Sequence, residues 1–507
     1  MTLFTKSSRP SIPWFWIGMA SVFMLSLLLR FWGLSRLNVL VFDEIYFAKF
    51  ANNYLTRTPF FDTHPPLSKY LIAIGIWIGS HLPFGKDTVN SLTGSQLTTF
   101  SYRWLNALTG SLIPLVVGAI AYQLSHRRSY AFIASLFVAV DGLFLVESRY
   151  ALNNIYLVIF GLLGQLGLLL ALEKQGRRRG LWLALSGVCF GASAAVKWNG
   201  LWFLLGTYLI LICAWVMRWM HFPRPIISDS FPSESSSPPN EDNPTQTATP
   251  LQNLAQLHWR KIILNLCIIP AGVYCLAWIP HLLIYPKPGF WEMQKQMLSY
   301  HQSVGSGPQE HPYCSAWYTW PFVIRPVGYY FQKVDETPTP GSSVFFRLQP
   351  SPPKTIYYDV HGMGNPVLWW LAAIAIIILL SILVLRIRTW VTVPETMTHQ
   401  NLFAVQLTEF WIALYLLVNY AANLLPWMRV TRCTFLYHYM GASVFAFLAL
   451  AWIVDRILQG YDLFLRMVGV TIVFLILMAF VFWLPVFLGL PLSPEAFYSR
   501  MWLPSWI

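Results

Sequence analysis

The stretch Met467–Leu490, MVGVTIVFLILMAFVFWLPVFLGL, contains 24 consecutive residues without a charged side chain. An apolar run of about 20 residues is long enough to cross a lipid bilayer as a helix. The sequence is therefore predicted to be an all-α polytopic membrane protein with eleven spans. Ten other runs of similar character are the remaining predicted spans: Ile12–Leu34, Tyr102–Leu124, Tyr130–Val146, Ala151–Leu172, Leu181–Val196, Leu201–Val216, Ile262–Ile284, Pro366–Leu385, Leu407–Leu425 and Phe435–Val454.

The composition supports this class. Of the 507 residues, 56% are hydrophobic and only 11% are charged. Soluble globular domains have about 25% charged residues and disordered chains have low hydrophobicity, so both classes are excluded. The formal net charge of +13 would suggest a nucleic-acid partner in a soluble protein. In a membrane protein it indicates basic loops that face an anionic lipid bilayer, together with a possible anionic substrate, so no nucleic acid is expected.

The short loops predict how the chain is oriented. Four of them hold the basic pairs or clusters that begin at Arg127, Lys174, Arg386 and Arg456, and placing these loops in the cytoplasm also places the N-terminus there. The run Leu71–Phe84 is too short to cross a bilayer comfortably. We expect it to lie on the outer surface as an interfacial helix.

A polar stretch divides the chain into two modules. Residues 223–253 are rich in Ser, Pro, Thr and Asn and show no apolar period, which is typical of a disordered segment. We therefore expect a disordered cytoplasmic linker at 223–258, between an N-terminal module at 1–222 and a C-terminal module at 259–507.

Two long outer loops are the places where function is expected. The first covers Ser35–Ser101, and the second covers residues 286–365. Loops of this length usually carry function, because most connections in compact domains are much shorter.

The first outer loop opens with two adjacent carboxylates, Asp43 and Glu44, just beyond the first span. Neighbouring side chains diverge, so the two need not share a task. One could take a proton from a hydroxyl group while the other orients the loop or pairs with a base. The alternative is a solvated acidic pair at a helix start, where carboxylates suit the helix dipole.

A second polar group follows in the segment FFDTHPPLSKY, at Phe60–Tyr70. The double proline fixes an extended backbone around Asp62, His64 and Lys69. His64 could titrate or donate to an anion, or the segment could simply brace the loop. The cluster offers too few ligands for a metal site, so no metal is predicted.

Several basic residues lie in or beside short segments predicted to be outside, against the usual bias. Each could snorkel from a span end. Together they indicate a site for an anion at the level of the lipid headgroups, because arginine binds phosphate bidentately and lysine supplies a point charge. These residues are Arg103, Arg149, Lys197, Arg429 and Arg432.

Aromatic and histidine side chains cluster in the second outer loop and at the start of a late span. His301, His311, Tyr313 and Trp317 could form a wall that holds a sugar or a peptide, or they could belong to an interfacial aromatic belt. His438 lies at the outer end of its span, where a polar side chain is a functional candidate.

The six cysteines and the absence of nucleotide motifs limit the alternatives. No CxxC pair occurs, and the sequence leaves open whether Cys314 and Cys433, both in predicted outer regions, form a bridge. No P-loop, no GxGxxG after a strand and no HExxH stands out, so no cofactor is expected and an ATP-driven pump is disfavoured.

The same motifs, taken in order, resemble a known family. They are Phe42-Asp43-Glu44, Phe61-Asp62-Thr63-His64-Pro65-Pro66-Leu67 with Lys69, Tyr102-Arg103, Ser148-Arg149-Tyr150, Lys197-Trp198-Asn199-Gly200, His311-Pro312-Tyr313, Gly364-Asn365-Pro366 with Trp369-Trp370, and Tyr437-His438-Tyr439. This series is similar to that of the protein O-mannosyltransferases, membrane glycosyltransferases of the GT-C class that use a polyprenyl-phosphate-mannose donor. The resemblance implies eleven spans and an extracytoplasmic active site, here at the plasma membrane.

The resemblance also implies roles for single residues. Asp43 would be the base that activates a Ser or Thr hydroxyl of a protein acceptor, and Glu44 would help to shape the acceptor site. The lipid phosphate would be held by Arg103, Lys197 and Arg432, with Arg149 expected at the same site. Around the acceptor and the sugar we expect Asp62, His64, His311, Tyr313, Trp317 and His438.

Two departures from the family pattern are visible. Asn153 and Asn154 occupy a segment where the family often has an aspartate, so a role for that acid is in doubt. The second outer loop is too short for the MIR domain of eukaryotic members, which indicates a bacterial-type enzyme. Two other functions stay open: a GT-C transferase that modifies a lipid or glycan, like an aminoarabinose transferase, and a sugar transporter, although the spans hold few charges besides Asp141 and Glu409. The sequence does not indicate the sugar, the preferred acceptor or the oligomeric state.

Overall fold

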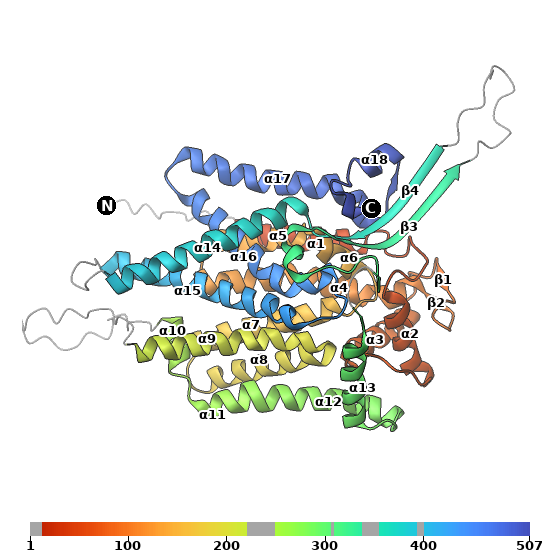
Figure 1. Cartoon of the computed structure of the whole chain (residues 1–507), viewed down its shortest axis with the longest axis horizontal. Coiled ribbons are helices and arrows are strands. Elements are labelled where there is room, and N and C mark those ends of the chain that lie inside the picture. Colours follow the sequence, from red (N-terminus) through yellow and green to blue (C-terminus); the bar gives the residue numbers. More distant parts are fainter. Residues whose placement is uncertain (1–12, 221–248, 306–308, 337–353, 393–399) are drawn as a thin grey trace, which may run out of the picture.

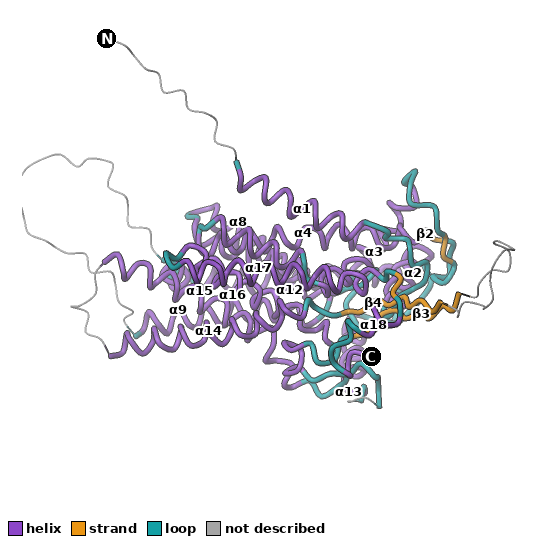
Figure 2. The backbone as a smooth tube through the Cα atoms, turned by 90° about the horizontal axis from the view of Figure 1, so that it is seen from above, coloured by secondary structure: helices purple, strands orange, loops and turns teal. Residues whose placement is uncertain are grey.

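The computed structural model describes residues 13–220, 249–305, 309–336, 354–392 and 400–507. Its long helices run side by side along one axis, and the strands gather at one end (Figure 1, Figure 2). Within these residues ten helical segments are long and apolar enough to cross a membrane, or eleven if one bent pair is counted as a span. The predicted multi-pass helical architecture is confirmed.

The ten candidate spans are formed by the following helices: α1 (Trp14–Phe31), α4 (Thr99–Ser125), α7 (Asn154–Glu173), α8 (Gly176–Val196), α9 (Leu201–Trp219), the continuous α11, η2 and α12 (Trp259–Ile262, Ile263–Ile268, Ile269–Ile284), α14 (Pro366–Thr392), α15 (Gln400–Leu424), α16 (Met440–Gln459) and α17 (Leu463–Leu488).

The bent pair corrects one predicted span. The run Tyr130–Val146 is not a single helix but α5 (Arg128–Ala139) and α6 (Gly142–Arg149), which meet at an angle of 59°. The bend lies at Asp141, whose carboxylate accepts a hydrogen bond from the backbone N–H of Phe144 at 3.0 Å and so starts a new helix. A short polar side chain that competes for backbone N–H groups favours such a helix start over continuation.

A buried polar cluster ties the two predicted modules together inside the bundle. Gln165 on α7 donates to the carbonyl of Phe203 on α9 at 2.7 Å and to Asn419 on α15 at 2.9 Å. The hydroxyl of Tyr415, also on α15, donates back to Gln165 at 2.7 Å. Hydrogen bonds between helices in a membrane contribute roughly 0.6–2 kcal/mol each, so this cluster fixes the register of three helices.

The end of the bundle that carries the strands is called the loop end from here on. It also holds α2 (Glu44–Thr56), α3 (Leu67–His81) and α13 (Phe290–Ser303) (Figure 1). The predicted surface helix at Leu71–Phe84 is α3, which is too short to count among the candidate spans. The smaller elements of this end are β1 (Val89–Asn90), β2 (Leu97–Thr98), η3 (Trp317–Phe322), η5 (Leu425–Arg429), η6 (Leu436–Tyr439), α18 (Pro494–Tyr498) and η7 (Pro504–Trp506).

A three-stranded antiparallel sheet at the loop end was not predicted from the sequence. β3 (Val327–Glu336) pairs with β4 (Lys354–Gly362), which pairs in turn with β5 (Pro491–Leu492). β3 and β4 both belong to the second outer loop. The pairing of β4 with a segment more than 100 residues further on has no local signal in the sequence.

The predicted linker also needs a correction at its C-terminal end. Residues 250–255 form the short helix α10 (Pro250–Ala255), which begins with a capping box between Thr249 and Gln252. Arg218 on α9 donates to the carbonyl of Ala255 at 2.9 Å and attaches this helix to the bundle. The expected disorder of residues 223–248 lies outside the described residues.

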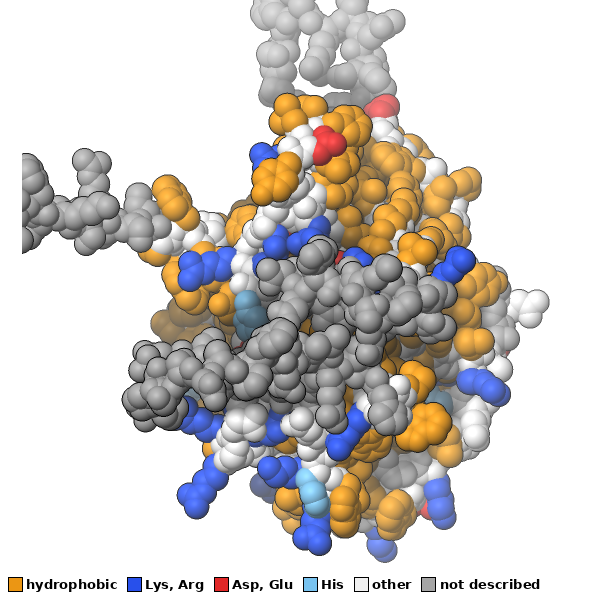
Figure 3. Space-filling view, turned by 90° about the vertical axis from the view of Figure 1, so that its left-hand side faces the viewer, with side chains coloured by type: hydrophobic (Ala, Val, Ile, Leu, Met, Phe, Trp, Pro, Cys, Tyr) orange, Lys and Arg blue, Asp and Glu red, His pale blue; other side chains and the backbone are white. Residues whose placement is uncertain are grey.

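The end of the bundle opposite the strands is called the basic end. Figure 3 shows lysine and arginine side chains spread across this face, with few acidic ones between them. The helix termini and turns that meet here carry the basic residues of the four short loops discussed above: Arg127, Arg128, Lys174, Arg177, Arg178, Arg386 and Arg456.

Candidate active site

Asp43 lies at the loop end, at the turn between α1 and α2. It occupies the N-cap position of α2, and the preceding residue, Phe42, has the left-handed backbone angle φ +46°. Asp43 is half-buried, and the hydroxyl of Tyr437 donates to its Oδ2 across 3.4 Å. Burial raises the pKa of Asp43 to about 6, although Lys197 and Tyr437 act in the opposite direction. This carboxylate is therefore mostly ionised at pH 7 and basic enough to accept a proton.

Lys197 lies on the same side of the bundle, where α8 ends. Its Nζ donates across 3.5 Å to Nε2 of His438 and lies 5.3 Å from the centre of the Tyr437 ring, which also contacts Asp43. Burial and the nearby Arg432 lower the pKa of Lys197 to about 8, while Asp43, Glu147 and Asp62 favour its charged form. At pH 7 the ammonium group is therefore mostly protonated, and it faces Asp43.

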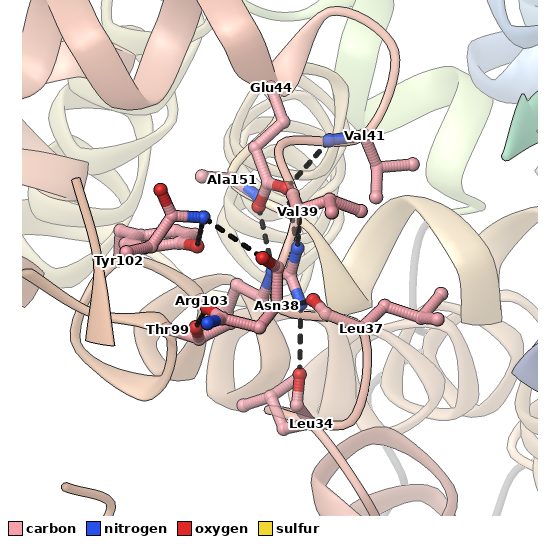
Figure 4. A network of polar contacts seen from close by, with 11 residues as sticks. Leu34, Leu37, Asn38, Val39, Val41, Glu44, Thr99, Tyr102, Arg103 and Ala151 are labelled. Carbon is pink, nitrogen blue, oxygen red and sulfur yellow. Dashed lines mark hydrogen bonds and ion pairs between the residues drawn. The ribbon is translucent and has the colours of Figure 1, made fainter. Parts of the chain in front are cut away.

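Glu44 points away from this centre and forms a buried clamp with Arg103. Two bonds join them, Nε to Oε1 at 2.9 Å and Nη2 to Oε2 at 2.7 Å, and both side chains are 0% exposed (Figure 4). Glu44 also accepts from the backbone N–H groups of Val41 and Ala151. These four contacts hold Glu44 within the protein, and the separate tasks expected of the two carboxylates stay a prediction.

The predicted phosphate-binding role of Arg103 needs correction. Its remaining N–H groups donate to the carbonyls of Leu34, Leu37 and Val39 at 2.7–3.1 Å (Figure 4). With the two bonds to Glu44, all five N–H donors of the guanidinium group are in use. Arg103 has no donor left for a phosphate and holds the first outer loop against α4.

Arg149 is also corrected. Its Nη1 and Nη2 donate to the carbonyls of Leu29, Arg30, Trp32 and Gly33 at 2.7–3.1 Å. These are carbonyls at the C-terminal end of α1, where a cation both fills hydrogen bonds and suits the helix dipole. Arg149 therefore caps α1 instead of facing Lys197.

The Asp62–His64 segment is held by a second buried ion pair. Lys69, which is 1% exposed, donates to Asp62 and to the carbonyls of His64 and Pro65 at 2.8 and 2.9 Å. Asp62 also accepts from the backbone N–H of His64 at 3.3 Å, and its predicted contact with the acceptor or sugar stays a prediction. The clamp fixes the backbone that carries His64.

The ring of His64 faces α13 and the cationic group. It stacks on His301 of α13 with a centroid distance of 5.5 Å, and His301 lies 5.9 Å from the ring of Trp198, next to Lys197. Burial, together with Lys197 and Arg432, lowers the pKa of both histidines, to about 4 for His301. Both are neutral near pH 7.

Arg432 completes the cationic side of the site. The guanidinium group is half-buried, and within the described residues its only hydrogen bond goes to the carbonyl of Cys433 at 3.0 Å. Cys433 forms a disulfide with Cys314, with the Cα atoms 5.3 Å apart, so the bridge that the sequence left open is present. It attaches the Arg432 segment to the second outer loop.

The predicted aromatic wall is only partly assembled around the site. His311 lies 6.0 Å from the ring of Phe42, and its Nδ1 accepts from the backbone N–H of Tyr313 at 3.2 Å, which leaves the other ring nitrogen to donate. Tyr313 itself packs under Arg325 at 5.4 Å. Trp317 packs against the apolar core, and the ring of Trp320 stacks on His438 with a centroid distance of 6.1 Å.

Three residues of the site were missed. Glu147 is a fully buried carboxylate at the end of α6, Tyr329 comes from the unpredicted β3, and Tyr437 contacts both Asp43 and Lys197. Glu147 adjoins the motif Ser148-Arg149-Tyr150, but its proximity to Lys197 depends on tertiary contacts alone. Among the described residues, no group of three or more His, Cys, Asp or Glu side chains is arranged to hold a metal ion.

Two solved structures share the fold. One is the yeast protein O-mannosyltransferase Pmt1-Pmt2 complex bound to the sugar donor: the TM-score is 0.74 at 15% identity, over 98% of this chain and 93% of that one. The other is the oligosaccharyltransferase of Archaeoglobus fulgidus in the apo form, with a TM-score of 0.50 at 12% identity, over 95% of this chain and 56% of that one. The likeness to these two structures shows the fold that this chain shares with them.

The family follows from the sequence comparisons. Residues 20–286 match the dolichyl-phosphate-mannose-protein mannosyltransferase family, and residues 287–506 match the C-terminal four-transmembrane region of protein-O-mannosyltransferase. The chain belongs to this mannosyltransferase family. The resemblance stated from the motifs is confirmed, and the lipid-modifying and transporter alternatives are not favoured.

Curated bacterial relatives cover most of the chain. The polyprenol-phosphate-mannose–protein mannosyltransferase of Mycolicibacterium smegmatis is 24% identical over 92% of this chain and 87% of its own length. The enzyme of that name from Corynebacterium glutamicum is 25% identical over 87% of this chain and 81% of its own length. Protein O-mannosyl-transferase 1 of the rat is 26% identical over 54% of this chain and 34% of its own length.

Proposed function

We infer that this chain transfers a mannosyl residue from a polyprenyl-phosphate-mannose donor to Ser or Thr hydroxyls of proteins, with Asp43 as the general base. The observation that carries this proposal is the pairing of an ionised carboxylate, Asp43, with two cations that have unused hydrogen-bond donors, Lys197 and Arg432. The names of the curated relatives support the donor and the acceptor.

The phosphate of the donor is assigned to Lys197 and Arg432. Within the described residues the Lys197 ammonium donates only to His438, and the Arg432 guanidinium only to Cys433, so both have N–H groups to offer. Charge-assisted hydrogen bonds of this kind are roughly twice as strong as neutral ones. Arg103 differs from these two cations because all five of its N–H groups are already occupied within the protein.

The reaction needs a base and a stabilised leaving group. Asp43 takes the proton of the acceptor hydroxyl while the oxygen of that hydroxyl forms a bond to C1 of the mannose. The bond from C1 to the phosphate oxygen breaks, and its electron pair stays on the departing lipid phosphate. Fixed positive charge at Lys197 and Arg432 stabilises that developing negative charge, so no acid is required. A single displacement inverts the configuration at C1.

His301 is suited to bind a sugar hydroxyl. Its Nε2 lies 3.0 Å from the carbonyl of Thr63, and a carbonyl can only accept, so the ring proton belongs on Nε2. Nδ1 then carries a lone pair, and it is buried without a partner within the described residues. A hydroxyl group of the donor sugar would satisfy it. His64, His311, Tyr313 and His438 remain candidates for the surrounding acceptor and sugar contacts.

We place the loop end outside the cytoplasm, at the plasma membrane. Basic residues gather at the opposite end, which fits the cytoplasmic side by the positive-inside bias. The disulfide between Cys314 and Cys433 belongs to the loop end, and disulfides persist in oxidising compartments. Under this orientation the N-terminus is cytoplasmic and the acceptor arrives from outside.

The test uses the full chain in liposomes with labelled polyprenyl-phosphate-mannose and two acceptors supplied in parallel, a Ser/Thr-rich peptide and a lipid extract. We expect label on the peptide and a rate about 10²–10⁴-fold lower for Asp43→Asn. Label on the lipid alone would overturn the protein acceptor. Transfer by Asp43→Asn at the wild-type rate would remove the proposed base.

A further inference from the structure

Glu147 is a buried carboxylate that the mechanism above does not use. It is 0% exposed at the end of α6. Its Oε1 accepts from the hydroxyl of Tyr329, and its Oε2 accepts from Nδ2 of Asn154 at 3.2 Å. Among the described residues no lysine, arginine or histidine forms an ion pair with it. A buried carboxylate held by two neutral donors is costly, which makes a structural role alone a poor explanation.

Tyr329 reaches Glu147 because β3 is irregular at this point. The register with β4 shifts between Gly328 and Tyr330, so Tyr329 is left out of the pairing. Gly328 allows the Tyr313 side chain to lie against the β3 backbone here, since a Cβ atom at position 328 would lie 2.4 Å from the hydroxyl oxygen of Tyr313. The result is an inward tyrosine, 5% exposed, that connects the sheet to α6.

The ring of Tyr329 also supports the residue before the base. It stacks on Phe42 with a centroid distance of 4.9 Å and an interplanar angle of 10°. Phe42 has φ +46°, a strained conformation for a bulky residue that persists only when the surroundings hold it. Phe435 at 6.0 Å packs on the same ring. The direction of the Asp43 side chain therefore depends on contacts that include Tyr329.

Glu147 also acts on the charges of the site directly. Its negative charge favours the protonated form of Lys197. Two further charged groups act on Lys197: Arg432 opposes its protonated form, and Asp62 favours it. Lys197 and Arg432 in turn act on three histidines, His64, His301 and His438. With Asp62 paired to Lys69, two carboxylates balance two cations.

We propose that Glu147 is a positioning residue for mannosyl transfer: it holds Tyr329, and through Tyr329 the Phe42–Asp43 turn, while its charge balances Lys197 before the donor phosphate binds. This inference rests on the proposed function. Two effects follow, one geometric and exerted on the base, the other electrostatic and exerted on the phosphate pocket, and they are separable by substitution.

Glu147→Gln keeps the size and the acceptor oxygen for Tyr329 but removes the charge. We expect the alkaline limb of the kcat/KM profile to move roughly one pH unit lower, because Lys197 loses an opposite charge. Tyr329→Phe keeps the stack on Phe42 but removes the hydroxyl, and Tyr329→Leu removes both. For Tyr329→Leu we expect kcat to fall on the order of 10²-fold, since misplacing a reacting group by 1 Å can have that effect. Its donor KM should change little.

The double variant Glu147→Gln/Tyr329→Phe should lose less than the sum of the single losses, because the two groups share one hydrogen bond. Glu173→Gln, at the basic end of α7, is the matched control and should behave like wild type. The inference is overturned if Glu147→Gln keeps the wild-type pH profile, or if activity in every variant simply follows the folded fraction measured by thermal unfolding. Neither outcome touches the proposed function, which is read from peptide mannosylation by the wild-type chain and its loss in Asp43→Asn.

Discussion

Arg103 on α4 and Glu44 at the start of α2 lie 59 residues apart and form a two-bond ion pair, 2.9 and 2.7 Å long, that no solvent reaches. Arg103 also donates to the backbone carbonyls of Leu34, Leu37 and Val39. Glu44 accepts hydrogen bonds from the backbone N–H groups of Val41 and Ala151. It therefore joins the first outer loop to α4 and to the connection between α6 and α7. Asp43, the adjacent residue, is left free for chemistry.

Breaking this pair should unfold the protein before it affects donor binding. Arg103→Met and Glu44→Gln each leave a buried, uncompensated group, and the loss is about 3–5 kcal/mol in unfolding free energy. Arg103→Lys should not rescue, because one ammonium cannot fill five hydrogen bonds in a plane. Thermal unfolding in detergent measures the effect, with Asp43→Asn as the control that keeps stability. An Arg103→Met protein with normal stability and a raised donor KM would restore the phosphate role.

The pH dependence of kcat/KM should be bell-shaped. Asp43 must be ionised to act as the base, so activity falls as pH drops through about 6, its raised pKa. Lys197 must be protonated to hold the phosphate, so activity falls again as pH rises through about 8, its lowered pKa. Lys197→Arg, whose side chain stays charged, should lose the alkaline limb. An unchanged alkaline limb in that variant would assign it to another group.

Substitutions of Lys197 and of Arg149 should have different effects on the donor KM and on thermal stability. Lys197→Met removes a cation with free donors, and we expect the donor KM to rise about 10-fold or more, in the range of 1.5–3 kcal/mol for hydrogen bonds to charged groups. Arg149→Met removes the cap of α1 and should lower thermal stability while the folded fraction keeps its donor KM. Steady-state kinetics at several donor concentrations, corrected for folded protein, distinguish the two. Identical KM effects would contradict the capping role of Arg149.

The disulfide should affect both stability and the donor. It closes a separation of 119 residues, and Cys433 is adjacent to Arg432. Cys314→Ser/Cys433→Ser should lower the unfolding free energy by roughly 2–4 kcal/mol. The donor KM should also rise, because Arg432 loses its anchor. Cys267→Ser, at a free and exposed cysteine on η2, is the control. A double variant with a normal donor KM would show that Arg432 is positioned without the bridge.

The number of spans and the location of Asp43, the proposed base, were accessible from sequence because both depend on local properties. Length and hydropathy decide whether a segment crosses a bilayer, whatever its neighbours are. Asp43 lies in the loop that follows the first span, so its position at one end of the bundle followed from that span alone. The exception, the bend at Asp141, arises because that carboxylate is also fixed by the indole N–H of Trp369 on α14, 228 residues away, at 2.7 Å.

The roles of the basic residues were a different problem. Arg103, Arg149 and Arg432 have the same chemistry and were all predicted at one end of the spans. All five N–H groups of Arg103 are occupied, Arg149 donates to four carbonyls at the end of α1, and Arg432 donates only to Cys433 within the described residues. Only the path of the backbone decides which carbonyls surround a guanidinium group. Glu147 was missed for the same reason, since its partner Tyr329 lies on a strand 182 residues further on.

The sequence by itself determined a multi-pass helical protein with a basic end, a carboxylate at the opposite end and the motif order of its family. These are properties of consecutive residues, and burial in a bilayer acts on them segment by segment. Only the tertiary structure decided that Glu44 and Arg103 form an ion pair, and that Lys197 and Arg432 have N–H groups without a partner among the described residues. It also decided that Glu147 binds Tyr329, whose ring stacks on Phe42 next to Asp43. Hydrogen bonds and charge pairs in a buried site are satisfied between distant segments, so their allocation is known only once those segments are packed together.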